Sequence, residues 1–514
     1  MSFTLSDISD FHPPKQRNYE SLPRAVQDNK THILLLLPFI IVGGADMFNL
    51  ELVKRINRDK YKFSVFTTVC RQNESEWTQI LKDNCFNFTA LQETMPASDW
   101  PSFISHYIET QNVDALWNFN SFFGYYLLPW LRVRFENLAL ADCIHVYSPY
   151  WRNGGYARLS AAFQEVSDLT ITSNQLTLDA IIKSCNMKQE HCKAFHIGTD
   201  TEFFDPDKVP FGTIRDKYAI EHSRPLILFL CRLSPEKRPL LMLKAAAKLI
   251  EKRPDVCFLI VGDGEMRERI EEERKILKLE NHVILAGSQE DVRPCYKDSD
   301  LLLICSLKEG ITQTTFEAMS MGLPIVSADV GGQSELVNDD TGKLVPCLQD
   351  ETDLYGTDYK TEEIESYVNA LLGLLDNLEN MKEMGKRNRR IITQKYTIDH
   401  AVRNFESFTD EILNEDKYLG QRRNVYNQLK KFPLLCEEII ILYVAYEKEM
   451  QLVIEMSSAR QSLQNLETVE ESNEHLLAMM NWYANFLTKT IIGKLCWKIM
   501  RAAYRLLRRK KEVS

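Results

Sequence analysis

Two basic side chains follow an apolar segment in the second half of the chain. Arg232 and Lys237 lie just beyond Pro225–Cys231, a run whose composition predicts a buried strand. A loop at this point would place both cations at the carboxyl edge of a sheet, where a planar guanidinium and a compact ammonium suit a diphosphate. An exposed basic loop without a ligand is the alternative interpretation.

Two glutamates follow a second apolar run, Leu301–Cys305, and lie eight residues apart. We expect a helix to begin near Thr312, so that Glu309 lies on the preceding loop and Glu317 about one turn inside the helix. The free N–H groups and the dipole of the first turn would favour a phosphate. The two carboxylates are then placed to meet hydroxyl groups, one of a sugar and the other of a ribose.

Glycines mark three further turns. Gly262 belongs to a Val-Gly-Asp-Gly segment, which suits either a ligand close to the backbone or a tight structural corner. The third glycine of a dinucleotide-binding motif is absent, so an NAD site is not favoured. Gly331-Gly332 is expected to open a helix that carries Glu335. Glu335 could equally be a solvated acid on that helix or a contact to a ligand. Gly43-Gly44 would let a phosphate or an acceptor approach the start of another helix.

One histidine and two arginines complete the candidate site. His145 lies at the end of an apolar run and would face the same edge, although an isolated histidine is more often a core residue. The segment Trp151–Arg158 is rich in polar, aromatic and glycine residues. We assign acceptor contacts to Arg152 and Arg158 within it, with a lid or a simple turn as the alternative.

Two parallel sheets are needed to position these residues. Apolar runs alternate with amphipathic segments up to about Asp205 and again after Pro206–His222, which predicts two α/β, doubly wound, Rossmann-like domains facing a cleft. The strands expected in the first domain are Ile33–Leu37, Phe63–Thr67, Ala115–Asn118, Cys143–Tyr147, Leu169–Thr172 and Ala194–Ile197. Those expected in the second are Pro225–Cys231, Val256–Val261, Val283–Leu285, Leu301–Cys305 and Pro324–Ser327.

Only helical patterns remain beyond about residue 360. We predict an N-terminal extension (1–30), two Rossmann-like domains (31–205 and 206–395), a closing helix (396–413), a helical extension (414–488) and a basic tail (489–514). Apolar residues from Leu452 to Leu466 repeat at coiled-coil spacing. They predict either a homo-oligomer formed through the extension or a helix packed on its own domain.

Composition narrows the class of protein. The net charge of −10 gives no reason to bind nucleic acid. Twelve cysteines lie without a CxxC pair or a Cys/His ligand spacing, so we expect reduced thiols, no metal site and a cytoplasmic location. Neither a secretion signal nor a membrane-spanning segment is recognisable.

The tail has a different character from the rest of the chain. Residues 489–511 contain nine Lys or Arg and no acid, so the remaining residues carry a net charge of −19. Lys494, Lys498, Arg501 and Arg505 would share one helix face, and Trp497 with several aliphatic residues supplies apolar surface. This pattern predicts peripheral attachment to the anionic inner face of the cytoplasmic membrane. A solvated helix or an oligomer contact is the alternative.

Taken together, these residues resemble the retaining glycosyltransferases of the GT-B fold, in particular glycosyltransferase family 4, also described as glycosyl transferases group 1. The resemblance covers about residues 31–395 and follows the order of the family's motifs. The matching elements are Gly43-Gly44, His145, Gly198-Thr199-Asp200, Arg232–Lys237, Val261–Gly264, Glu309 to Glu317, and Glu317–Pro324.

The resemblance implies a transferase that moves a sugar from a nucleotide-diphosphate sugar to a sugar, glycan or lipid-linked acceptor, with retention of anomeric configuration. The first domain would bind the acceptor and the second the donor, in cell-surface polysaccharide or glycolipid synthesis. Arg232 and Lys237 would hold the diphosphate, Glu309 and His145 the donor sugar, and Glu317 the ribose. The remaining donor contacts would come from Gly44, Gly262, Ile311, Thr312, Thr314 and Thr315. No cofactor or metal would be needed.

The chain departs from the family pattern at two points. Cys231 replaces the usual small residue before Arg232, and Ile-Thr-Gln follows Glu309-Gly310 in place of the commoner Phe-Pro-Asn. These departures leave the donor open. Two other hypotheses remain: a non-catalytic protein that binds nucleotide sugars or glycans, and a helical scaffold or assembly protein.

Overall fold

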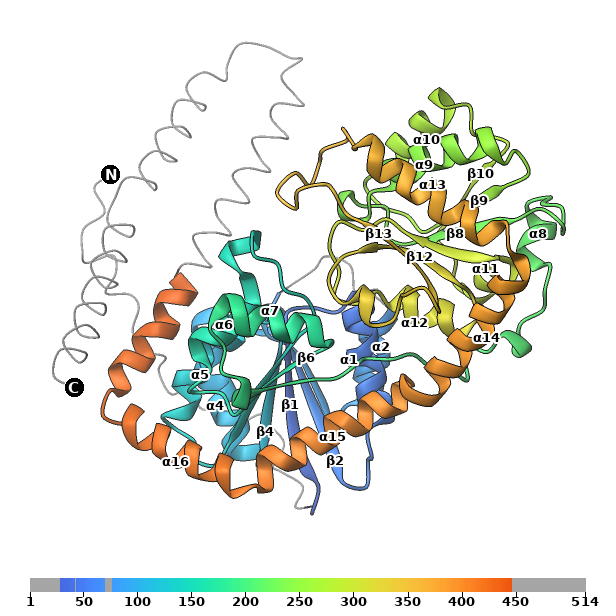
Figure 1. Ribbon diagram of the computed structural model, residues 1–514. Helices are drawn as coiled ribbons and strands as arrows, with labels where there is room; N and C mark the ends of the chain where they lie inside the picture. Colours follow the sequence, from blue (N-terminus) through green and yellow to red (C-terminus); the bar gives the residue numbers. More distant parts are fainter. Residues whose placement is uncertain (1–27, 42, 70–75, 446–514) are drawn as a thin grey trace, which may run out of the picture. The chain divides into compact units, whose positions relative to one another are not determined.

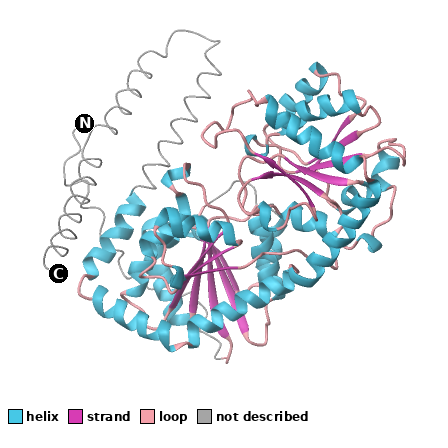
Figure 2. Ribbon diagram, in the orientation of Figure 1, coloured by secondary structure: helices cyan, strands magenta, loops and turns pink. Residues whose placement is uncertain are grey.

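The computed structural model describes residues 28–41, 43–69 and 76–445, and those of the described residues that precede Ala445 belong to one compact unit. Two parallel sheets organise this unit, each flanked by helices (Figures 1 and 2). Ten of the cysteines lie in the described part, and all ten are free thiols.

The first domain contains a seven-stranded sheet in the order β3-β2-β1-β4-β5-β6-β7, with every neighbouring pair parallel. Its strands are β1 (Thr31–Leu37), β2 (Tyr61–Thr67), β3 (Asn87–Ala90), β4 (Ala115–Phe119), β5 (Ala139–Ile144), β6 (Leu169–Thr172) and β7 (Cys192–Ala194). Its helices are α1 (Gly44–Arg55), α2 (Glu76–Asn84), α3 (Leu91–Thr94), α4 (Trp100–Gln111), α5 (Phe122–Arg132), α6 (Gly155–Phe163) and α7 (Gln175–Cys185).

The second domain contains a six-stranded parallel sheet in the order β10-β9-β8-β11-β12-β13. Its strands are β8 (Leu226–Leu230), β9 (Cys257–Val261), β10 (Val283–Gly287), β11 (Leu301–Ile304), β12 (Ile325–Asp329) and β13 (Gly342–Pro346). Its helices are α8 (Thr213–Lys217), α9 (Pro239–Lys252), α10 (Arg267–Ile276), α11 (Arg293–Asp298), α12 (Gln313–Ser320) and α13 (Thr361–Leu375), followed by α14 (Leu378–Lys395).

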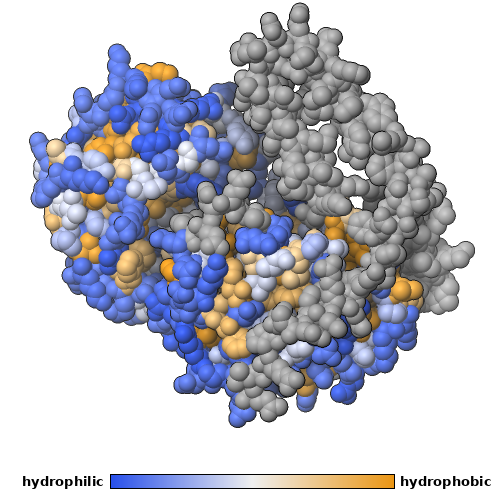
Figure 3. Space-filling model, turned by 180° about the vertical axis from the view of Figure 1, so that it is seen from behind, coloured by the Kyte–Doolittle hydropathy of each residue, from blue (hydrophilic) through white to orange (hydrophobic). Residues whose placement is uncertain are grey.

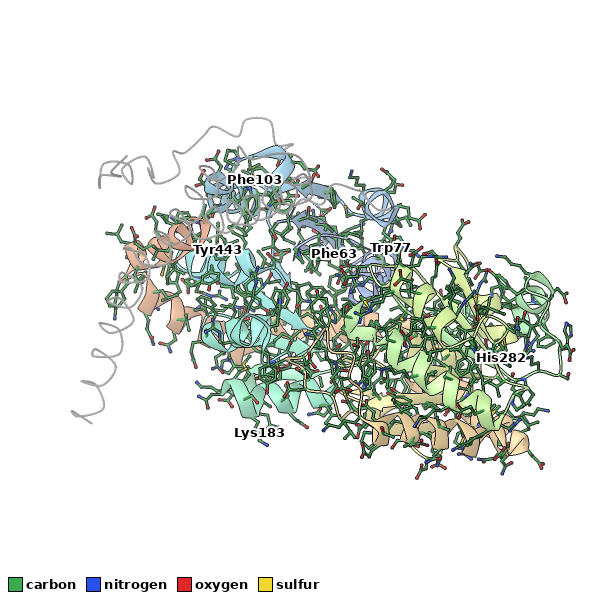
Figure 4. The ribbon with its side chains drawn as sticks, turned by 90° about the horizontal axis from the view of Figure 1, so that it is seen from above. Phe63, Trp77, Phe103, Lys183, His282 and Tyr443 are labelled. Carbon is green, nitrogen blue, oxygen red and sulfur yellow. The ribbon has the colours of Figure 1, made fainter. Side chains whose placement is uncertain are left out.

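Burial on both faces explains why the central strands are continuously apolar. In β1, Ile33 and Leu35 pack into one hydrophobic cluster and Leu34 into another on the opposite face. Figure 4 shows Phe63 and Phe103 within this domain, and the two side chains belong to those two clusters. Helices therefore cover both faces of the sheet, as the uninterrupted apolar runs predict.

Strand positions differ from the sequence prediction in four places. β5 ends at Ile144 rather than Tyr147, and β7 covers Cys192–Ala194 rather than Ala194–Ile197. β3 and β13 were not expected, because both are edge strands with half-buried residues and lack a long apolar run.

The chain crosses from one domain to the other twice, and the two crossings lie side by side. Thr199 and Thr397 form a parallel bridge, in which the Thr199 N–H donates to Tyr396 O (3.1 Å) and the Ile398 N–H donates to Thr199 O (2.8 Å). The second crossing leads into α15 (Ile398–Asn414) and then α16 (Asp416–Leu429) (Figure 1). Phe405 of α15 packs against Phe63 and Trp117. After leaving the second domain, the chain therefore returns to the core of the first.

On the face seen in Figure 3, the described residues show hydrophilic surface interspersed with apolar areas. Among the exposed apolar residues are Phe432 and Leu434, which follow α16, and Leu434 is 73% exposed. Within the described part, no helix is both long and apolar enough to span a membrane. The predicted coiled-coil segment and the basic tail lie outside the described residues.

Candidate active site

The loop after β8 carries the two predicted cations in different environments. Arg232 is exposed, and its Nη2 donates to Glu236 Oε1 at 2.9 Å. Lys237 is more enclosed, with a side chain 20% exposed, and its ammonium forms an ion pair with Glu309. Burial opposes the charge on Lys237, but the Glu309 carboxylate outweighs it and raises the lysine pKa. Lys237 is therefore held as a cation beside Glu309.

The pairing of Lys237 with Glu309 follows from the topology. β8 and β11 are neighbours in the second sheet, so the loops at their carboxyl ends lie together although 72 residues separate the two side chains. The sequence prediction placed both residues at this edge, and the structure brings them into contact.

The next residue, Arg238, is the buried arginine of this loop. Its Nε donates to Cys305 O (2.5 Å), and its Nη1 pairs with Glu363 Oε1 of α13 at 2.7 Å. The guanidinium thus ties the start of α9 to the end of β11 and to α13. Sequence reasoning did not single out Arg238, because nothing in its local pattern distinguishes a buried arginine from its exposed neighbours.

Helix α12 begins where the sequence predicts, with Thr312 as its N-cap. The Thr312 Oγ1 accepts from the Thr315 N–H (3.2 Å), and Gln333 bonds to both threonine hydroxyls, at 3.2 Å to Thr312 and 2.9 Å to Thr315. Among the described residues, the N–H groups of Gln313 and Thr314 have no hydrogen-bond partner. The first turn of α12 therefore offers backbone donors to an anion.

Glu317 lies just over one turn into α12 and is 7% exposed. Burial raises the pKa of its carboxyl to about 7, and a hydrogen bond donated by Tyr296 Oη to Glu317 Oε2 (2.7 Å) offsets part of that effect. Tyr296 was not identified from the sequence. Its role depends on how α11 packs against α12, which no local motif encodes.

Residues of the first domain meet this edge through two glycines. A Cβ at Gly310 would lie 2.2 Å from the carbonyl oxygen of His145, so only glycine allows the loop after Glu309 to approach so closely. A Cβ at Gly44 would lie 3.2 Å from Gln313 Cβ, which places the start of α1 against the start of α12. His145, Gly44, Glu309 and α12 are thus assembled at one place.

His145 is neutral in this environment. Burial lowers its pKa to about 4, and its ring packs edge-on against Phe48 and Phe119. Its Nδ1 is buried without a hydrogen-bond partner among the described residues. The His145 ring is thus enclosed by neighbouring aromatic side chains, although it lies just beyond the end of a strand.

Gly262 forms a tight structural corner, as one of the two interpretations of its motif required. Its φ is 122°, and a Cβ there would lie 1.9 Å from Cys231 O. This packing accounts for the glycine, and a ligand contact at Gly262 stays a prediction.

Ile311 is buried, and a Cβ at Gly332 would lie 2.8 Å from Ile311 Cγ1.

The expectation that Glu335 could be a solvated helix acid is wrong. Gly332 leads only into a short 3-10 turn, Gln333–Glu335, and the carboxylate contacts the first domain. It accepts from the backbone N–H groups of Gln175 (3.2 Å) and Leu176 (2.7 Å), and it pairs with His196 Nε2 at 2.7 Å. Burial opposes the charge on Glu335, but His196 and the two N–H groups outweigh it and lower the carboxyl pKa.

The two arginines assigned to the acceptor lie in the segment after β5. Arg152 adopts a φ of 46°, and its guanidinium lies 4.6 Å from the ring centroid of Phe122 and 5.6 Å from that of Trp151. Arg158 is exposed on α6. Their contact with an acceptor stays a prediction.

Comparisons with known proteins bear on the family and the fold. Residues 210–391 match the family model described as "Glycosyl transferases group 1". The chain is similar to UDP-Gal:alpha-D-GlcNAc-diphosphoundecaprenol alpha-1,3-galactosyltransferase of Escherichia coli, at 28% identity over 42% of this chain and 54% of that protein. It is also similar to N-acetyl-alpha-D-glucosaminyl L-malate synthase of Bacillus anthracis, at 28% identity over 40% of this chain and 50% of that protein. The chain thus spans about half the length of these relatives.

Solved structures establish the fold. A glycosyltransferase from Rickettsia africae ESF-5 superposes with a TM-score of 0.64, at 17% identity, over 76% of this chain and 100% of that chain. Anabaena Alr3699/HepE in complex with UDP gives a TM-score of 0.60, at 19% identity, over 74% of this chain and 100% of that chain. The prediction of a GT-B fold with two Rossmann-like sheets and a helical C-terminal region is confirmed.

Proposed function

We propose that the protein is a glycosyltransferase of the EC 2.4 class that uses a nucleotide-diphosphate sugar and retains the anomeric configuration, as in glycosyltransferase family 4. The observation that carries this proposal is the Lys237–Glu309 pair beside the open first turn of α12. A cation, a carboxylate and backbone N–H donors converge there, within the segment that matches the group 1 family model.

The proposed reaction breaks the bond between the anomeric carbon and the diphosphate and forms a bond from that carbon to an acceptor oxygen. The proton of the acceptor hydroxyl passes to the departing diphosphate. Lys237, Arg232 and the N–H groups at the start of α12 stabilise the charge that develops on the leaving nucleoside diphosphate. Glu309 and the neutral His145 hold the transferred sugar, and Glu317 binds the ribose. These groups supply the stabilisation without a metal ion.

The acceptor and its location are further parts of the proposal. One relative is named for transfer to a GlcNAc-diphosphoundecaprenol, a sugar on a lipid carrier, which supports a role in polysaccharide or glycolipid synthesis. Arg152 and Arg158 would contact the acceptor. The basic residues of 489–511 would hold the protein on an anionic cytoplasmic membrane surface.

Donor hydrolysis by the purified full chain tests the proposal. We expect turnover of one member of a panel of UDP-, GDP- and dTDP-sugars, undiminished by EDTA. Lys237→Ala should lower kcat/KM at least a hundredfold, on the order of 3 kcal/mol of transition-state stabilisation. Lys248→Ala is the matched control, because Lys248 pairs with Glu365 on the outside of the same domain.

Three outcomes would contradict this proposal in different ways. Nucleotide binding without turnover would favour the non-catalytic binding protein, and absence of both would favour the scaffold. Loss of turnover in EDTA with recovery in Mn²⁺ would overturn metal independence alone.

A further inference from the structure

Glu317 has one oxygen committed to the protein and one uncommitted. Its described hydrogen bond is the one from Tyr296 to Oε2, at 2.7 Å. In the described part of the structure, Oε1 has no hydrogen bond to a protein group. It is also not completely enclosed, because the fully buried polar atoms that lack a partner do not include it. Oε1 is therefore the oxygen that remains available to a ligand.

Tyr296, which donates this hydrogen bond, is held in place by its packing. It is fully buried on α11, and its ring packs edge-on against Phe204 at 6.1 Å between centroids. The helix is anchored in turn by Asp298, whose carboxylate accepts from the N–H groups of Gly212 and Ile214, both at 2.6 Å. The phenol oxygen thus has little freedom to move.

The direction of the hydrogen bond to the ionised carboxylate is also fixed. Burial and the nearby Glu317 charge raise the pKa of Tyr296 well above its ordinary value, so the phenol keeps its proton. Cys295 of α11 is the other titratable group facing Tyr296, and burial raises its pKa to about 12, so it stays neutral. Tyr296 is consequently the donor whenever the Glu317 carboxyl is ionised.

We propose that Tyr296 is a positioning residue for nucleotide binding, which orients the Glu317 carboxylate so that Oε1 meets the hydroxyl groups of the donor's ribose. This inference rests on the proposed function, in which Glu317 binds the ribose. It adds a residue that touches no substrate and acts only through Glu317. A hydrogen bond to a carboxylate both fixes its rotation and favours its charged form.

The competing explanation is that Tyr296 only fills the space between α11, α12 and Phe204. Tyr296→Phe separates the two explanations, because it keeps the ring and removes the hydroxyl. Tyr367→Phe is the matched control: Tyr367 is equally buried in the same domain, and its hydroxyl donates to Ile304 O at 3.4 Å.

The test measures binding of a nucleoside diphosphate to the full chain by calorimetry. The probe is whichever of UDP, GDP or dTDP binds the wild type most tightly, compared with its analogue that lacks the ribose hydroxyls. We expect Tyr296→Phe to weaken the hydroxyl-bearing nucleotide about tenfold, as for the loss of one hydrogen bond to a charged group. The analogue should bind Tyr296→Phe and the wild type equally, and Tyr367→Phe should match the wild type with both.

A pH series adds a readout that packing alone would not change. Without the phenol donor the Glu317 pKa rises further, so the deficit of Tyr296→Phe should be larger at pH 7 than at pH 9. The double variant Tyr296→Phe/Glu317→Gln should bind like Glu317→Gln alone, because Tyr296 acts through that carboxylate.

Equal weakening of both nucleotides, an additive double variant or unchanged binding by Tyr296→Phe would overturn the role of Tyr296 while leaving the proposed function intact. Absence of nucleotide binding by the wild type would overturn both. If Tyr296→Phe does not fold, Glu317→Gln carries the test. It should lose the preference for the hydroxyl-bearing nucleotide, and retention of that preference would sink the inference.

Discussion

The ligand-binding role proposed for Glu317 conflicts with the stability of the folded protein. A carboxyl that is 7% exposed and has one protein hydrogen bond resists ionisation, and its pKa is about 7. In the unfolded chain the same group ionises near its ordinary value of 4.5. The folded protein is therefore penalised when the pH rises through this interval, because the unfolded state releases its proton first.

Glu317→Gln should remove this penalty. The stability that the neutral carboxyl contributes is full below pH 4.5 and is lost as the pH rises through about 7. The variant should therefore gain free energy of unfolding over the wild type as the pH rises, by about 2 to 3 kcal/mol between pH 5 and pH 8. Urea unfolding at both pH values measures the change.

Glu280→Gln is the control for that experiment, since Glu280 is an exposed glutamate of the same domain. Its free energy relative to the wild type should stay constant across the same pH range. A gap between Glu317→Gln and the wild type that does not widen with pH would show that Glu317 ionises freely in the folded protein.

At the scale of residues, the sequence predicted which side chains lie at strand ends but not which ones they contact. Lys237 and Glu309 were identified because loops at the carboxyl ends of parallel strands converge. Tyr296 and Arg238 were missed, since their partners come from helices packed through the tertiary fold. Glu335 was misjudged for the same reason: its partners belong to the other domain.

At the scale of elements, the start of α7 is held by a carboxylate from outside its own domain. Asn174 is its N-cap, and its side chain accepts from Thr177 N–H at 2.7 Å. The Glu335 carboxylate accepts hydrogen bonds from the first two N–H groups of the helix, those of Gln175 and Leu176. An anion at a helix N-terminus is favourable, and here that interaction joins the two domains.

Replacing Glu335 by Gln should weaken this contact by about 1 to 2 kcal/mol at pH 7. Because the pKa of Glu335 is lowered on folding, its contribution is present above pH 4.5 and is lost as the pH falls through the lower folded value. Urea unfolding followed at pH 7 and at pH 3.5 should show a larger deficit at the first pH than at the second.

Glu383→Gln is the matched control, because Glu383 forms an exposed ion pair with Lys386 within α14 alone. That variant should leave the free energy of unfolding at pH 7 nearly unchanged, because exposed ion pairs contribute little to stability. A deficit in Glu335→Gln no larger than in the control would remove Glu335 from the interaction between domains.

Elements were predictable where burial on both faces made strands continuously apolar. β1, β2, β4 and β6 were located within a few residues. β3 and β13 lie at sheet edges and bury little, so they lack the composition of the central strands. The first residue of α12 was foreseen because a threonine N-cap follows a buried strand.

At the scale of the whole molecule, charge is distributed unevenly along the chain. A chain ending at Thr488 loses nine positive charges and leaves an acidic protein. We expect it to stay folded and to lose most of its binding to vesicles of phosphatidylserine and phosphatidylcholine, because each basic residue near an anionic surface contributes about 1 kcal/mol. Co-sedimentation at low and high salt should show salt-sensitive binding by the full chain only.

Vesicles of phosphatidylcholine alone provide the control, since they attract neither chain electrostatically. If the shortened chain sediments with anionic vesicles as well as the full chain, the tail is not the anchor. Its apolar face would then have to serve in packing or in oligomerisation.

The bridge between Thr199 and Thr397 determines how the second domain is connected to the first. Both ends of that domain meet at one short pair of hydrogen-bonded segments, so it is in effect an insertion into the chain of the first domain. Exchange of the whole second domain between relatives would then require the two crossings to be matched at one place in the structure. Any hinge motion between the two domains would have to bend the chain at this one place, where both crossings lie.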